Sequence, residues 1–198
     1  MVIFCPTSSG ALDWVRRSDV RSVARFKVMV YIVNRQRRER LDRAAVAQLA
    51  QATLDAVLRP RLAAAVDVNV AFVGDEPMRR LNLTYRNIDA PTDVLSFAHL
   101  ALPSPYDHAP AQREAWFFSQ MTASLDGERP LLGEVVIAAP TARRYAERHA
   151  LTFAQEIQRL VIHGVIHLCG YDHETDAGQM TRLERRLRRQ LLASPAAW

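Results

Sequence analysis

Apolar and polar residues follow two periods along this chain. A spacing of two, or a short run of β-branched and aromatic residues, is typical of strands, and it occurs at residues 28–33, 66–73, 94–97 and 134–138. A spacing of three or four is typical of amphipathic helices, and it occurs at residues 41–58, 75–86, 140–150, 152–169 and 176–192. The pattern predicts an α+β fold, in which a small mixed sheet of about four strands is packed with about five helices.

Capping residues set the expected limits of these helices. Asp42 is placed to cap the first one, and Pro60 ends it. Pro77 lies in the first turn of the second helix, where proline is tolerated. Thr152 and Gln155 have the spacing of a capping box, which predicts that a helix begins there.

Residues 98–131 show no sustained period and contain four prolines, which predicts a long loop. Its Trp116-Phe117-Phe118 run is either a platform on which RNA bases stack or an anchor that folds onto the core, and we favour the anchor. His99 and His108 have no ligand spacing and are expected at the surface.

Length and composition fit one globular domain. The chain has 198 residues, of which 49% are hydrophobic and 24% charged. The first 28 residues are Arg-rich but carry Asp13 and Asp19, which transit peptides usually lack.

The net charge of +5 comes almost entirely from arginine, since Lys27 is the one lysine among 26 Lys and Arg. Arginine binds phosphate in a bidentate manner, which favours a nucleic-acid partner, although a GC-rich genome would also enrich arginine. No apolar run approaches the roughly 20 residues of a membrane span. Cys5 and Cys169 do not form a disulfide framework, which indicates a reducing, cytoplasmic compartment.

Three histidines form a candidate metal site. His163 and His167 are four residues apart, so a helix would place both imidazoles on one face. Gly170 can end that helix in the left-handed conformation and return His173 towards them. Three neutral nitrogen ligands leave one position of a tetrahedral Zn²⁺ open, as in catalytic zinc sites. Ni²⁺ and Cu²⁺ also accept imidazole ligands. Cys169 is turned away from the histidine face and is not expected to bind the metal.

The same spacing occurs in the zinc protease motif H-E-x-x-H-x-x-G-x-x-H, with one difference. The glutamate that serves those proteases as general base is replaced here by Gly164. This argues against peptide hydrolysis by that route.

The segment His-Gly-Val-Ile-His-Leu-Cys-Gly-Tyr-Asp-His resembles the H-G-x-x-H-x-x-G-Y-D-H signature of the YbeY family of bacterial metal-dependent endoribonucleases. Further matching blocks follow the family order, at residues 34–37, at 81–86 with Asp89, at 91–97 and at 132–137. The family usually has Gly-Asp where this chain has Gly133-Glu134. The resemblance extends over residues 29–185, and proteins of that family begin near the position of Met29. It therefore implies a single catalytic domain at 29–198, preceded by an extension at 1–28 that is disordered or results from an early start codon.

The resemblance implies a role in maturing the 3′ end of small-subunit ribosomal RNA and in ribosome quality control. It also implies that Arg86 lies in the cleft beside the metal, where it binds substrate; without the resemblance, Arg86 is a solvated residue at a helix end. The small ribosomal subunit and its RNA are then the expected partners.

The expected reaction is cleavage of single-stranded RNA. A metal held by neutral ligands keeps its full charge, which lowers the pKa of a water and polarises a phosphoryl oxygen. The nucleophile is either that water or the 2′-OH of the substrate, and Arg86 is expected to stabilise the developing charge. Asp172 is a catalytic candidate, either as general base or as a partner that orients an imidazole.

Two other functions are consistent with the sequence. The chain could be a ribosome assembly factor with a structural metal, or a metal-dependent hydrolase of a small phosphoester whose long loop acts as a lid. The arginines of the final helix, residues 182, 185, 186, 188 and 189, either bind RNA phosphates or form a solvated helix face.

Overall fold

The computed structural model describes residues 2–4, 29–121 and 129–192. Five strands form one sheet: β1 (Val2–Phe4), β2 (Val30–Asn34), β3 (Asp67–Val73), β4 (Val94–Ala98) and β5 (Leu131–Ala138). The helices are α1 (Arg43–Val57), α2 (Pro60–Ala63), α3 (Asp75–Arg86), α4 (Pro110–Met121), α5 (Ala139–Arg148), α6 (Phe153–Leu168) and α7 (Gln179–Leu191). None of the helices in these ranges has the length and hydropathy to cross a membrane.

The strand order is β1-β4-β5-β3-β2, and only the β4–β5 pair is antiparallel. The predicted mixed α+β fold is therefore confirmed. The four expected strands form, and β1 adds a short edge strand beside β4. Residues 2–4 fall within the expected extension at 1–28; residues 5–28 lie outside the part of the chain that the structure describes.

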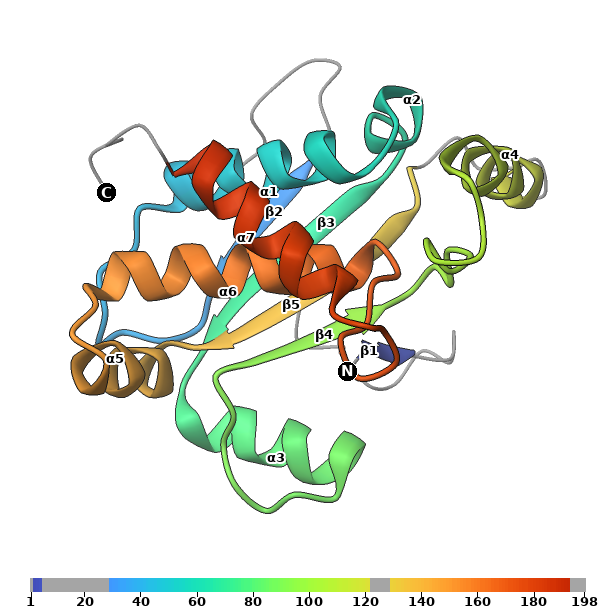
Figure 1. Ribbon diagram of the computed structural model, residues 1–198. Coiled ribbons are helices and arrows are strands. Elements are labelled where there is room, and N and C mark those ends of the chain that lie inside the picture. The colour runs from blue at the N-terminus through green and yellow to red at the C-terminus, as the bar shows by residue number, and fades with distance from the viewer. Residues whose placement is uncertain (1, 5–28, 122–128, 193–198) are drawn as a thin grey trace.

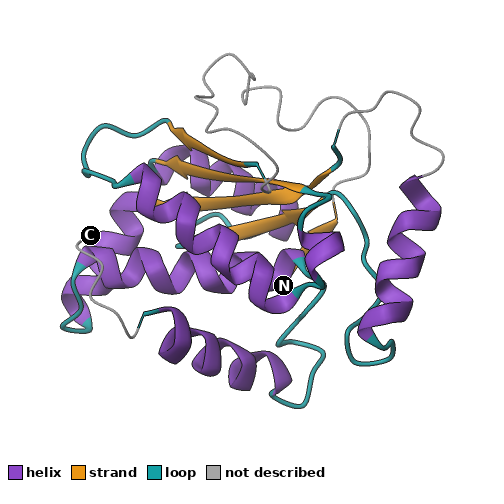
Figure 2. Cartoon of the chain, turned by 90° about the horizontal axis from the view of Figure 1, so that it is seen from above, coloured by secondary structure: helices purple, strands orange, loops and turns teal. Residues whose placement is uncertain are grey.

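The sheet has a helix layer on each face, because its strand residues alternate between two cores. Val70 and Val135 belong to a large core with α1, α6 and α7. Their neighbours Ala71 and Val136 belong to a smaller core, into which α3 inserts Met78. The sheet lies between these layers, while α4 stands apart at one end of it (Figures 1 and 2).

The predicted helix limits hold where a capping side chain sets them. The Asp42 carboxylate accepts a hydrogen bond from the Ala45 N–H at 3.0 Å, and the Thr152–Gln155 capping box is present at the start of α6. The final helix begins at Gln179, later than expected, since Gly178 is its N-cap.

The prediction of a loop at 98–131 is wrong for its central part, where α4 forms. Its aromatic run explains why: Phe117 is 1% exposed, and Trp116 and Phe118 pack partly buried against the large core. The core-anchor interpretation of this run is thus confirmed. Tertiary burial stabilises a helix that its own residues signal only weakly.

Gly164 allows α6 to approach the sheet closely. A Cβ at this position would lie 2.5 Å from Val135 Cγ1 and 3.2 Å from Ser96 Oγ. The Ser96 hydroxyl donates to the Gly164 carbonyl at 3.3 Å. The position that carries glutamate in zinc proteases therefore faces the sheet at a point where no side chain fits.

We expect the substitution Gly164→Val to destabilise the fold, because overpacking a close helix–sheet contact costs about 1–3 kcal/mol. Urea denaturation measures the change in the free energy of unfolding. Gly74→Ser is the control, since a Cβ there meets only Pro77 Cδ, at 3.9 Å. Equal stability of the two variants would contradict the close approach.

Candidate metal centre

The three predicted histidines lie together at the C-terminal end of α6. His163 and His167 share one helix face, and Gly170, with φ +87°, reverses the chain so that His173 returns to them. The ring centroids are 4.6 Å apart for His163–His167, 5.1 Å for His167–His173 and 5.4 Å for His163–His173. One potential ligand atom from each residue lies within 4.8 Å of the other two.

Hydrogen bonds orient two of the three rings. His167 Nδ1 lies 2.8 Å from the Tyr171 carbonyl oxygen, and His163 Nδ1 lies 3.0 Å from Glu184 Oε2. Both partners are acceptors, so each Nδ1 carries the proton and each Nε2 carries a lone pair. The two Nε2 atoms are 3.2 Å apart.

This arrangement fits a metal ion. The 3.2 Å between the two Nε2 atoms is close to the separation of two nitrogen ligands of one tetrahedral zinc ion, whose Zn–N distances are about 2.0–2.1 Å. His163, His167 and His173 would hold the ion, and neutral imidazole is the form that binds metals. Burial, followed by the neighbouring His163, lowers the pKa of His167 to about 3. Burial also lowers the pKa of the more exposed His173.

Glu184 is a site residue that the sequence analysis missed. It lies on α7, whose residues Met180, Leu183 and Leu187 are buried, and it reaches across to α6. Burial raises the pKa of this carboxyl, but the hydrogen bond from His163 and the positive charges of Arg159 and Arg188 together outweigh that effect, and the net shift is downward. A signal was present, because Glu184 is the one acid in an otherwise basic helix and adjoins its apolar stripe.

A second polar network fixes α6 to the start of β4. The Arg159 guanidinium donates to the fully buried Glu156 carboxylate at 2.6 and 2.9 Å and to Asp93 Oδ2 at 3.1 Å. Asp93 belongs to the Pro-Thr-Asp block that supported the family resemblance. That block therefore connects the ligand helix to the sheet.

Asp172 lies in the turn beside His173. Its carboxylate accepts from the Glu174 N–H at 3.1 Å. Burial raises the pKa of Asp172, but this backbone hydrogen bond and nearby positive charge together lower it by more, so the net shift is downward. Its predicted catalytic role stays a prediction.

Arg86 is the last residue of α3, on the face of the sheet opposite α6. Its Nε is buried and has no hydrogen-bond partner. The predicted position of Arg86 beside the metal stays a prediction. Glu134 is also on the face away from α6, because it alternates with Val135, and it hydrogen-bonds Asn69 Nδ2 at 2.7 Å.

Other expectations can be compared with the structure. The Cys169 side chain is fully buried, its pKa is raised by burial to about 12, and it is not part of the histidine cluster. His108 is exposed as expected, whereas His99 is half-buried. The five arginines of the final helix are exposed.

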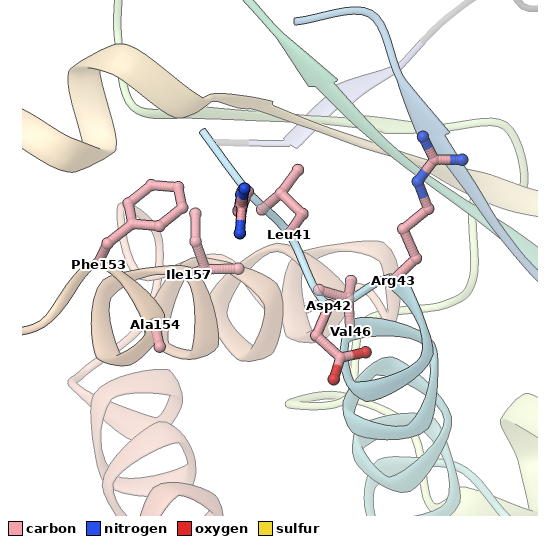
Figure 3. Close-up of a pocket in the computed structure, with 8 residues that line it drawn as sticks. Leu41, Asp42, Arg43, Val46, Phe153, Ala154 and Ile157 are labelled. Atoms are coloured by element: carbon pink, nitrogen blue, oxygen red, sulfur yellow. The ribbon is translucent and has the colours of Figure 1, made fainter. Parts of the chain in front are cut away.

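A cavity of about 720 Å³ lies at the other end of α6 from the histidines. Its lining includes Leu41, Val46, Phe153 and Ile157, from the starts of α1 and α6 (Figure 3). It contains none of the three histidines.

We expect Glu184→Gln to weaken zinc binding by about 10- to 100-fold, the usual effect of removing a carboxylate partner from a ligand histidine. Competition with a chromophoric chelator measures the affinity. Glu147→Gln, at an exposed position on α5, is the control. If both variants bind zinc equally well, Glu184 does not support the ligand.

Comparisons with known proteins agree with these observations. The family model described as endoribonuclease YbeY matches residues 31–192. A protein named endoribonuclease YbeY from Moorella thermoacetica is 40% identical over 131 residues, which cover 64% of this chain and 75% of that protein. The protein of the same name from Heliobacterium modesticaldum is 35% identical over 125 residues, covering 62% and 68%.

A solution structure of a Thermotoga maritima protein aligns with 83% of this chain and 90% of its own, at a TM-score of 0.47 and 20% identity. The family match spans β3, β4 and β5, all of β2 except Val30, and all the site residues described above. On the strength of that match and its histidine triad, the chain belongs to the endoribonuclease YbeY family of metal-dependent hydrolases.

Proposed function

We propose that this protein is a single-strand-specific, zinc-dependent endoribonuclease. The observation that carries the proposal is the convergence of three imidazoles, two of which have their Nδ1 protons committed to acceptors on the protein. Three neutral ligands and no protein carboxylate in the triad favour an anionic substrate, because the charge of the ion is not compensated by its ligands. Family membership adds RNA as the substrate class.

When bound, a divalent ion at this site supplies a Lewis acid for the phosphodiester and lowers the pKa of a water. The chain's own residues hold and orient it. His163 is aligned by Glu184 and His167 by the Tyr171 carbonyl. The role proposed for Arg86, to stabilise charge on the transferring phosphoryl group, rests on the family resemblance.

The role of Asp172 follows from its environment. Its carboxylate is tied to the Glu174 N–H, and its lowered pKa makes it a weaker base at neutral pH. This argues against a general base and favours the second of its two possible roles, in which Asp172 helps to orient an imidazole, here through the turn that it shares with His173.

The cellular role that we propose is 3′-end maturation of small-subunit ribosomal RNA and ribosome quality control in the cytoplasm. The exposed arginines of α7 support an RNA partner, since they lie on the same helix as Glu184. They support the alternative equally well, namely a ribosome assembly factor that binds RNA and uses its metal only for structure.

Replacing His167 with Ala separates the two functions. We expect loss of RNA cleavage by at least 100-fold with RNA affinity retained, because the change removes a metal ligand but no arginine. Cleavage of a single-stranded RNA and a filter-binding assay measure the two properties. Elemental analysis of the purified protein, with cleavage assayed before and after chelation, identifies the metal.

His149→Ala is the matched control, because His149 is exposed at the end of α5 and outside the triad. Normal ribosome maturation in cells that carry His167→Ala would contradict the enzyme and support the assembly factor.

A further inference from the structure

The segment between β4 and β5 lies against the turn that carries the third histidine. It includes α4, and two of its polar side chains, Tyr106 and Arg113, contact residues 169–176. We call these two residues the brace. Neither was a candidate from the sequence, because the segment was expected to be a loop without site residues.

Arg113 contacts the end of the ligand helix. It is 5% exposed, its Nε donates to the Pro103 carbonyl at 2.8 Å, and its Nη2 donates to the Cys169 carbonyl. Cys169 is the C-cap of α6, where helix carbonyls lack partners and the helix dipole favours a cation. A Cβ on Gly170 would lie 3.3 Å from Arg113 Nη2. The Arg113 guanidinium therefore lies close to the residue at which the chain reverses before His173.

Tyr106 contacts the residues on both sides of His173. Its hydroxyl accepts from the Asp172 N–H at 3.2 Å and donates to Asp176 Oδ2 at 2.9 Å. Burial and the bond to Asp176 raise the pKa of Tyr106 to about 12, so the hydroxyl keeps its proton at neutral pH. Its ring also meets the Tyr171 ring edge-on, with centroids 5.7 Å apart.

The same contact reaches the start of α7. The Asp176 carboxylate accepts from the Gly178 N–H at 2.7 Å, and Gly178 is the N-cap of α7. That helix carries Glu184, the partner of His163. The Tyr106 hydroxyl therefore connects the turn that carries His173 with α7, the helix whose Glu184 orients His163.

The helix α4, which carries Arg113, is itself anchored to the body of the protein. Phe117 is buried in the large core, and Glu114, 7% exposed, pairs with Arg59 Nε at 2.9 Å. Arg113 thus extends from a fixed element, which is the condition under which it can hold a turn in place.

We propose that Tyr106 and Arg113 are positioning residues that set the place of His173 relative to His163 and His167. The inference rests on the proposed metal-dependent function. It adds to that function the two residues that position the third ligand, His173. Neither residue is proposed to touch the metal or the RNA.

Tyr106→Phe tests the proposal, since it removes a single oxygen atom. We expect zinc affinity to fall about tenfold or more, as for other residues that orient ligands, with the melting temperature of the metal-free chain unchanged. Chelator competition measures zinc affinity. The visible spectrum of the Co²⁺-substituted protein reports ligand geometry and is expected to change. Tyr145→Phe is the matched control, because Tyr145 contacts Arg159 and His149 through its ring.

Arg113 gives an independent variant pair. Arg113→Met is expected to lose more zinc affinity than Arg113→Lys, because lysine can still donate to the Cys169 carbonyl. Should Arg113→Met fail to fold, Tyr106→Phe still decides the question.

The outcomes separate this inference from the proposed function. A parent chain that binds neither Zn²⁺ nor Co²⁺ overturns both. If the parent binds both ions and Tyr106→Phe matches it in affinity and Co²⁺ spectrum, the brace is overturned and the proposed function is unaffected.

Discussion

The site depends on holding two imidazole nitrogens, His163 Nε2 and His167 Nε2, 3.2 Å apart. This is close to the separation of two nitrogen ligands of one tetrahedral zinc ion, whose Zn–N distances are about 2.0–2.1 Å. The protein sets this separation by fixing the far nitrogen of each ring, His163 to a carboxylate on α7 and His167 to a carbonyl in the following turn. Because both rings are oriented in advance, the site is prepared for a metal ion.

That constraint requires a rigid helix. Gly164 lets α6 lie close to β5, and the Arg159–Glu156–Asp93 network, in which Glu156 is fully buried, joins it to the start of β4. A carboxylate this deeply buried is stable only when it is paired, so the network favours one position of the helix on the sheet. His163 and His167 are therefore held in defined positions, because both are on α6.

Much of the fold and the site followed from local patterns. The five predicted helices and four predicted strands form, and the histidine triad converges as its spacing indicated. The error at α4 has a physical cause: the helix is stabilised by burying Phe117 in a core made by distant residues, and that burial leaves little trace in its own periodicity. The prolines at 103, 105, 110 and 130 are loop signals, and they led to the wrong prediction.

The sequence by itself determined the triad, because His163, His167, Gly170 and His173 are close in the chain, and a helix followed by a reversal at Gly170 brings the three histidines together. Only the tertiary structure decided which groups hold them. Glu184 is 21 residues from His163, and Arg113 is 56 residues from Cys169. Contacts over such separations depend on how whole elements pack, and local sequence patterns contain no information on that packing.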